Sequence, residues 1–324
     1  MWKRLRELIY ARASRAGELV AGSAQGAQTE QRNEATVVAE RAAALLRGGV
    51  PPARAFAVIA ADASSTSATG VIAARITDGV PIPSALAAND APEWRVLAVA
   101  WRLAEECGAP LAPALQRIAY ALRELDQMRE RRSVLLAGPR ATVRMVAALP
   151  ILALLLGVLL GFDPVPVLLS PAGAVIASVG TGLLGVGVHW SRVMQRRAAN
   201  DDQIAGLPFE LMWVALGGGA PPPAAARHVV DRVDHYGAEW VPFDGFCSGS
   251  SLHSTLAAAE SAGVPMRPLL LEQADAERVA SAARLEREAE RLGVRVLLPL
   301  GVCVLPAFIV LGVVPVVLSM FGAV

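Results

Sequence analysis

The sequence is poor in aromatic residues and cysteines and has no excess of either charge, and each shortage excludes a class of protein. Aromatic residues make up only 5% of the 324 residues, which disfavours β-sheets. The three cysteines lack the spacing of a zinc or redox site, so each is expected to be a small core residue. A formal net charge of +1 gives no reason to expect nucleic-acid binding. The chain is instead 54% hydrophobic with a mean hydropathy of +0.45, which predicts membrane segments.

Three long stretches contain no Asp, Glu, Lys or Arg, and each is long enough to cross a bilayer, which takes about 20 apolar residues. They cover residues 145–162, 164–188 and 296–324. Only Asp163 and the prolines that follow it separate the first two stretches, which predicts a tight helical hairpin. None of the three carries the intramembrane charge that usually marks an ion or proton pathway, so a transporter is disfavoured.

Arginines flank the same side of all three predicted spans, and the positive-inside rule places that side in the cytoplasm. The start of the chain is charged and has no apolar stretch of signal-peptide length. We therefore expect a multi-pass plasma-membrane protein with a cytoplasmic N-terminus and its C-terminus on the outer face. The flanking residues are Arg131, Arg132, Arg140 and Arg144 before the first span, Arg192, Arg196 and Arg197 after the second, and Arg284, Arg287, Arg291 and Arg295 before the third.

Two short motifs occur twice in the same order. Residues 46–53 resemble residues 216–223, and residues 108–115 resemble residues 263–270 with the shared pattern G-x-P-x-x-P-x-L. Each second motif leads into a charged segment and then an apolar span, which indicates an internal duplication. Because glycine ends helices and proline favours the first turn of the next, the Gly-x-Pro steps predict helix–turn–helix corners.

The segments between these corners have helical apolar spacing, which predicts a packed helical core. We therefore predict an all-α integral membrane protein with two related cytoplasmic antiparallel helical bundles and three transmembrane helices. The predicted core stripes are Trp94, Leu97, Ala98 and Trp101, and Leu115, Ile118, Ala119 and Leu122. The predicted parts are a loosely ordered lead-in at 1–35, a first cytoplasmic domain at 36–144, a transmembrane hairpin at 145–188, a second cytoplasmic domain at 189–295 and a third transmembrane helix at 296–324.

Residue patterns typical of chemistry are scarce. The glycines at 217–219 are followed by prolines and not by the Gly-Lys-Ser/Thr of a phosphate-binding loop. On a helix, His228, Asp231 and His235 share a face that could hold a divalent ion, although incidental surface residues are the favoured interpretation. No nucleophile–base pair is placed by any motif. We predict no catalytic, cofactor-binding or metal-binding residue and no cofactor, so the protein is not expected to be an enzyme.

Two features allow a second interpretation. The charge-rich segments 117–132 and 277–291 are typical of solvated helix faces, with a docking surface as the alternative. The glycines within the spans favour close helix packing, with self-association or a partner's transmembrane helix as the alternative.

The two motif pairs, the hairpin and the final span resemble the type II secretion system F family, which comprises inner-membrane platform proteins of type II secretion, type IV pili and Tad/Flp-type pili. The stretch from Leu207 to Met212, leading into the glycines at 217–219, resembles the opening of the domain in the Tad-type branch. The resemblance implies a six-helix antiparallel bundle for each domain. It also implies a non-enzymatic protein that couples a cytoplasmic secretion ATPase to assembly of pilin or pseudopilin subunits.

The partners implied by the resemblance are the secretion ATPase, pilin or pseudopilin subunits and other inner-membrane secretion components, in a homo- or hetero-oligomer surrounded by membrane lipid. No nucleic acid is expected. The alternatives are a membrane-anchored scaffold or regulator unrelated to secretion and, less favoured, a transporter subunit. Neighbouring genes for a secretion ATPase and small pilins would separate a platform protein from another scaffold.

Overall fold

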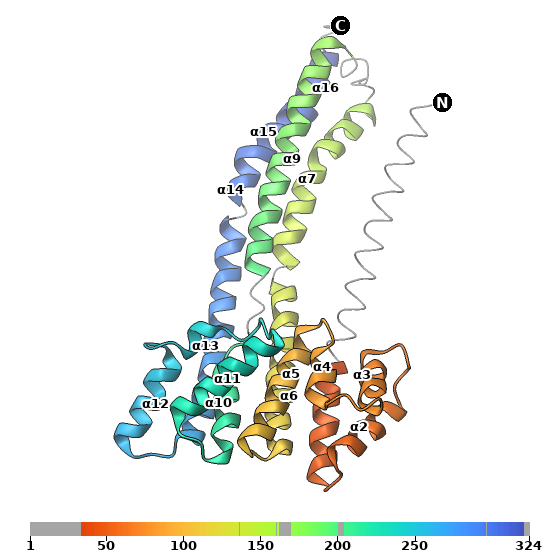
Figure 1. Ribbon diagram of the computed structural model, residues 1–324. Helices are drawn as coiled ribbons and strands as arrows, with labels where there is room; N and C mark the ends of the chain where they lie inside the picture. The colour runs from red at the N-terminus through yellow and green to blue at the C-terminus, as the bar shows by residue number, and fades with distance from the viewer. Residues whose placement is uncertain are drawn as a thin grey trace. The chain divides into compact units, whose positions relative to one another are not determined.

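The computed structural model describes residues 34–135, 137–159, 161, 170–199, 204–295 and 297–320. Within these ranges all regular structure is helical and no strand occurs (Figure 1). Three helices are long and apolar enough to cross a membrane, which confirms the predicted class. The predicted hairpin tip around Asp163 and nearly all of the lead-in at 1–35 lie outside the described residues.

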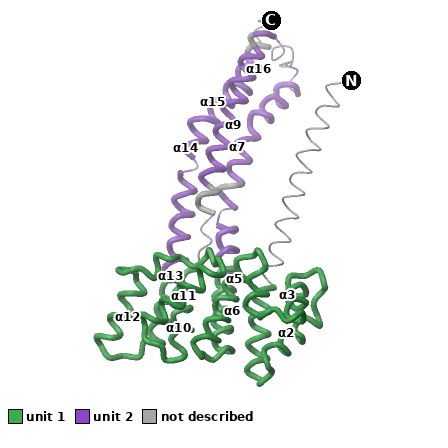
Figure 2. The backbone as a smooth tube through the Cα atoms, in the orientation of Figure 1, with its two compact units in different colours: residues 1–126, 203–279 green, residues 127–202, 280–324 purple. Residues whose placement is uncertain are grey.

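The chain divides into two compact units, coloured separately in Figure 2. Unit 1 comprises residues 1–126 and 203–279, and unit 2 comprises residues 127–202 and 280–324. Unit 1 is therefore built from segments on both sides of the first two candidate spans, whereas unit 2 contains those two spans and the last one. Below, the described residues of unit 1 are called the first segment (34–126) and the second segment (204–279).

The helices of unit 1 lie side by side, with α12 at one end, α10 and α11 next to it, then α5 and α6, and α2 and α3 at the other end (Figure 1). In the first segment they are a helix at 34–47, α2 (Pro52–Ala61), α3 (Ala68–Thr77), α4 (Ile82–Ala87), α5 (Pro92–Cys107) and the start of α6 (Leu111–Leu135). In the second segment they are α10 (Leu207–Ala215), the turn η1 (Leu216–Gly218), α11 (Pro222–Tyr236), the turn η2 (Phe243–Phe246), α12 (Ser251–Ala262) and the start of α13 (Met266–Arg295).

Glycines in the left-handed conformation end several of these helices, which confirms the predicted corners. Gly49 and Gly219 have φ angles of 80° and 83°, and each is followed by a helix that begins with proline. Gly108 and Gly263 end α5 and α12 with φ angles of 68° and 65°. A side chain is strained at such angles, so glycine is the residue that lets the chain reverse here.

One hydrophobic core serves both segments of unit 1. Every residue of the two predicted core stripes is at most 1% exposed, which confirms that prediction, and Trp94 and Trp101 are fully buried. The same core continues into the second segment through residues such as Leu207 and Leu270. The predicted pair of bundles is thus packed as a single unit.

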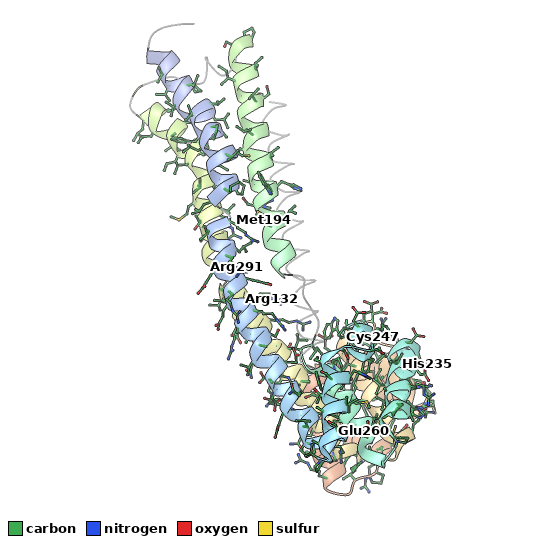
Figure 3. The ribbon with its side chains drawn as sticks, turned by 90° about the vertical axis from the view of Figure 1, so that its left-hand side faces the viewer. Arg132, Met194, His235, Cys247, Glu260 and Arg291 are labelled. Carbon is green, nitrogen blue, oxygen red and sulfur yellow. The ribbon has the colours of Figure 1, made fainter. Side chains whose placement is uncertain are left out.

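Unit 2 contains the apolar helices. They are α7 (Ala137–Leu159), α9 (Pro171–Ala199) and a run of α14 (Leu297–Pro299), η3 (Leu300–Val304), α15 (Leu305–Phe308), η4 (Ile309–Val313) and α16 (Val314–Met320). The candidate spans are Ala141–Leu159, Gly173–Met194 and the apolar end of the helical segment Met266–Val317. In Figure 3, Arg132 and Arg291 lie close together on α6 and α13, and Met194 lies near one end of α9.

Prolines shape the last of these spans without breaking it. Both η3 and η4 are π-helical turns, and each ends two residues before a proline, Pro306 and Pro315. A proline has no N–H to donate, and its ring clashes with the carbonyl four residues earlier, which here lies inside the π-turn. The wider turn accommodates the ring, because Leu305 and Val314 donate to carbonyls five residues back.

Two glycines of α9 pack closely against these π-turns. A Cβ at Gly180 would lie 2.4 Å from Leu311 Cγ, and one at Gly187 would lie 2.8 Å from Cys303 Cβ. A Cβ at Gly182 or Gly185 would have no atom within 4 Å. The interpretation of close helix packing is therefore confirmed for one face of α9.

Candidate functional site

The joint between the two segments of unit 1 carries an extended set of ion pairs and hydrogen bonds. Helix α5 of the first segment contacts both α10 and α11 of the second. It is also covered by α4 of its own segment. The face of α5 that meets the second segment includes charged residues, so the joint combines apolar packing with ion pairs.

The three consecutive glycines at 217–219 are explained by this joint. A Cβ at Gly218 would lie 1.4 Å from the carbonyl oxygen of Cys107, and one at Gly217 would lie 2.6 Å from Ala109 Cβ. Gly219 has open space but a φ of 83°. Two glycines therefore permit close backbone approach and the third permits the turn, with no phosphate-binding role needed.

A buried carboxylate, Glu210 on α10, lies at the centre of the joint. Its side chain is fully buried and its Oε1 accepts a hydrogen bond from Arg278 Nη2 on α13. Arg117 Nε on α6 lies 2.9 Å from the same oxygen. Burial raises the pKa of Glu210, and the positive charges of Arg278 and Arg117 oppose that shift.

The same two guanidinium groups share a second carboxylate. Arg117 Nη2 and Arg278 Nη1 donate to Asp275 Oδ1 at 2.8 Å and 2.7 Å. Both groups also lie over the ring of Tyr120, at 5.0 Å and 5.1 Å from its centroid. Two positive and two negative groups are thus held together, and this charge balance offsets the cost of burying Glu210 and Arg278. The four charged residues and Tyr120 are called the Glu210 cluster below.

A second set of polar contacts links α5 to α11. Arg102 Nε donates to Glu106 Oε1 at 2.8 Å, and Arg232 Nε on α11 lies 3.6 Å from Glu106 Oε2. Arg95 Nη1 donates to the carbonyl oxygen of Gly237 at 3.3 Å. Helix α5 is therefore tied to α11 along its length.

The central pair of the Glu210 cluster has a counterpart in the first segment. Arg123 on α6 pairs with Glu40 on the helix at 34–47. Glu40 precedes Glu210 by 170 positions and Arg123 precedes Arg278 by 155, which are the offsets of the two repeated motifs. The first pair is exposed, with side chains 36% and 57% accessible, whereas Glu210 and Arg278 are 0% and 9% accessible.

Sequence reasoning missed the Glu210 cluster, although the two offsets contained a signal for it. The segment 277–291 was interpreted as a solvated charged face, and Arg278 contradicts this because it is buried against Glu210. The offsets of 170 and 155 positions, applied to charged residues, relate Glu40 to Glu210 and Arg123 to Arg278, so the repeat predicts a Glu–Arg pair in each segment.

The residues singled out for ion binding lie on α11. His228, Asp231 and His235 are all exposed, and His235 lies on the outer side of the helix with its ring edge-on to Tyr236 (Figure 3). Among the described residues, no group of three His, Cys, Asp or Glu side chains is arranged to hold a metal ion. The absence of catalytic, cofactor-binding and metal-binding residues stays a prediction.

The cysteines differ in environment. Cys303 is buried and Cys107 is half-buried, as expected of small packing residues. Cys247 is exposed, so that expectation was wrong there. The reason is that Cys247 follows the short turn η2 and does not lie on a core-facing helix.

Comparison with known proteins assigns the first part of the chain. Residues 38–159 match the family described as type II secretion system (T2SS), protein F. These residues form a protein F domain. The domain begins within the helix at 34–47 and ends with the last residue of α7, so it includes Glu40, Arg117 and Arg123. The second segment lies outside the matched range, and no curated protein matches the chain. A protein F domain implies a role in a secretion or pilus-assembly system.

Proposed function

We propose that the chain is a non-enzymatic inner-membrane platform protein of a type II secretion or Tad-type pilus assembly system. In this role it couples a cytoplasmic secretion ATPase to the assembly of pilin or pseudopilin subunits. The observation that carries the proposal is the protein F domain at 38–159, which ends in a helix apolar enough to cross a membrane.

The proposed topology places unit 1 in the cytoplasm. It is supported by the arginines beside each candidate span, among them the exposed Arg144, Arg192 and Arg295. The N-terminus then lies in the cytoplasm and the C-terminus on the outer face. An ATPase that acts in the cytoplasm would meet unit 1.

The second segment is proposed to be a shortened copy of the first, and the predicted domains at 36–144 and 189–295 would be these two copies. Equal glycine turns support this, because Gly49 and Gly219 differ in φ by only a few degrees, as do Gly108 and Gly263. The recurring Glu–Arg ion pair supports it further. The shorter second copy connects α11 to α12 through η2, where the first copy has α3 and α4.

The joint suggests how unit 1 could transmit force as one body. Arg117 and Arg278 join α6 to α13 through Asp275, and both helices are long. With 25 and 30 residues, they extend about 37 Å and 45 Å at 1.5 Å per residue. A displacement applied to unit 1 would move the starts of both helices together, because the ion pairs between them resist separation.

The test is co-purification of the full chain, solubilised in detergent, with the secretion ATPase encoded beside it. The expected result is specific retention of the ATPase, together with loss of pilus or pseudopilus assembly when the gene is deleted. The full chain is used because both segments share one core, so deleting either would expose the other's apolar face. No retention, with assembly intact in the deletion strain, would favour a membrane scaffold unrelated to secretion.

A further inference from the structure

Exposed arginines gather at one end of the apolar helices of unit 2. A small hydrophobic cluster joins three helices there, with Val143 of α7 and Leu292 of α13 buried in it and Met194 of α9 packed against it. Each of these residues has an arginine one or two positions away in the sequence, and a fourth arginine follows one helical turn later on α13. We call these four residues the edge arginines: Arg144, Arg192, Arg291 and Arg295.

The edge arginines have no acidic partner in the part of the chain that the structure describes. All four side chains are exposed, and no ion pair joins any of them to an Asp or Glu of the described residues. Acids are scarce in the surrounding sequence, because between Glu130 and Asp201 the only one is Asp163, which follows the first predicted span. After Glu290 there is none, whereas earlier on α13 arginines and glutamates alternate. Positive charge is therefore unbalanced at the edge arginines.

The edge arginines lie where a membrane-spanning helix would leave the hydrocarbon layer. Arg144 is in the first turn of the candidate span Ala141–Leu159, and Arg192 is in the last turn of Gly173–Met194. The rise along that second span up to Arg192 is about 28 Å at 1.5 Å per residue, close to the roughly 30 Å thickness of the hydrocarbon layer. Trp190 precedes Arg192 by two positions and is 42% exposed, and tryptophan favours this boundary. Lipid headgroups are therefore the first molecules that these guanidinium groups meet.

Exposed apolar side chains begin directly beyond the edge arginines. Met145 follows Arg144 and is exposed. Leu297 and Leu298 follow Arg295 at two and three positions and are exposed as well. Positive charge followed by apolar surface matches the order in which a phospholipid presents its phosphate and its acyl chains. This surface therefore complements a lipid in both its polar and its apolar part.

The guanidinium group also selects among lipids. Its planar fork donates two hydrogen bonds to one phosphate, and it stays charged at any physiological pH. Phosphatidylcholine offers a phosphate whose charge its own choline cancels, whereas phosphatidylglycerol carries a net negative charge. Because no acid compensates the edge arginines, they attract the anionic lipid more strongly, by about a factor of five for each basic residue at the surface.

We propose that the edge arginines form a binding site for anionic phospholipid headgroups in the leaflet at this end of the spans. The guanidinium groups hold the phosphate, and the acyl chains lie along the exposed apolar surface of the same helices. The bound lipid supplies the negative charge that the described chain lacks at this level. The inference requires the candidate spans to lie in a membrane, but it does not require the secretion ATPase or a pilin as partner.

Trp190 provides a local measurement, because it is the only tryptophan among the residues that make up unit 2. The full chain is reconstituted in phosphatidylcholine vesicles that contain equal fractions of either brominated phosphatidylglycerol or brominated phosphatidylcholine. Bromine quenches nearby tryptophan fluorescence, and subtracting the signal of a Trp190→Phe chain isolates the contribution of Trp190. We expect stronger quenching by the brominated phosphatidylglycerol, equivalent to a preference of about fivefold beside Arg192.

Two matched variants test which arginine is responsible. Arg192→Gln should remove most of the preference at Trp190, while the other three edge arginines keep the charge that orients the spans. Arg287→Gln is the control, since it makes the same change at an exposed arginine of α13 that lies between two glutamates, and it should keep the preference. Equal quenching of the unaltered chain by the two brominated lipids would overturn the site. An equal loss in both variants would overturn its assignment to the edge arginines.

Further arms distinguish the lipid from other anions. Excess glycerol 3-phosphate, added at constant ionic strength, should leave the quenching unchanged, because a soluble phosphate has no acyl chains to hold it at the boundary. Loss of the preference on this addition would indicate a general anion site and overturn the lipid proposal. Loss of ATPase co-purification in Arg192→Gln without any lipid preference would assign the arginine to a protein partner instead. A lipid preference in a chain that retains no ATPase would count against the platform function alone.

Discussion

Replacing Gly218 by alanine tests whether the joint requires close backbone approach. The added Cβ would lie 1.4 Å from the carbonyl oxygen of Cys107, and ordinary contact begins at 3.4 Å. The two segments would therefore have to separate by about 2 Å, and the obstacle is backbone that cannot rotate away. Overpacking usually costs about 1–3 kcal/mol, and a backbone clash of this depth belongs at or above the upper end of that range.

The matched control is Gly219→Ala, because it tests conformation alone. Gly219 has a φ of 83° and no atom within 4 Å of its added Cβ, so we expect a cost of about 1 kcal/mol. Thermal unfolding followed by tryptophan fluorescence suits the purpose, since Trp94 and Trp101 are buried in the core of unit 1. At about 2–4 °C per kcal/mol, Gly218→Ala should lower Tm by about 6–12 °C and Gly219→Ala by about 2–4 °C. Equal shifts, or a larger shift for Gly219→Ala, would refute the argument from backbone approach.

Three further predictions follow from contacts described above. Glu210→Ala should cost about 3–5 kcal/mol of unfolding free energy, because it leaves two arginines beside an empty buried site. Glu40→Ala removes a more exposed ion pair and should cost at most about 1 kcal/mol. Denaturant titration of both variants measures these costs, and equal values would contradict the role of burial. Gly187→Leu should disrupt the packing of α9 against the last span, whereas Gly185→Leu should be tolerated. The yield of monodisperse protein in detergent measures this. A lower yield for Gly185→Leu than for Gly187→Leu would show that the other face of α9 packs against the last span. Burial and the negative charge of Glu106 raise the pKa of the Cys107 thiol, so less of the reactive thiolate is present at pH 7.5. In a variant that keeps only this cysteine, maleimide labelling should be slower than labelling of free cysteine. The difference in rate should shrink as the pH rises towards the raised pKa.

Local chemistry made much of unit 1 predictable. Gly-x-Pro steps have one strong conformational preference, so the corners at Gly108 and Gly263 followed from the sequence. The stripe through Trp94 and Trp101 followed from helical periodicity, because apolar residues spaced by one turn must share a face. The candidate spans were also predictable, because length and absence of charge suffice to define them.

The joint could not be predicted in the same way because it depends on residues far apart in the sequence. Glu210 and Arg117 are separated in the sequence by the first two candidate spans, and no local pattern indicates that they meet. A buried arginine such as Arg278 also looks like any other residue of a charged helix until its partner is known. The π-turns before Pro306 and Pro315 were missed because proline alone predicts a kink without saying how the helix absorbs it.

The shared core of unit 1 fixes an order of events during synthesis. Helix α5 is complete once Cys107 has left the ribosome, but its partner α11 ends only at Tyr236. The roughly 130 intervening residues, which include two candidate spans, take on the order of 10 s to synthesise. During that interval the apolar side of α5 has no cover from the second segment, and the proposed topology requires the two candidate spans to be synthesised before that cover exists. Under the proposed topology, the first two candidate spans must insert so that both segments lie on the same side of the membrane before unit 1 can close. A chain that inserts otherwise would leave the apolar side of α5 exposed to chaperones and proteases.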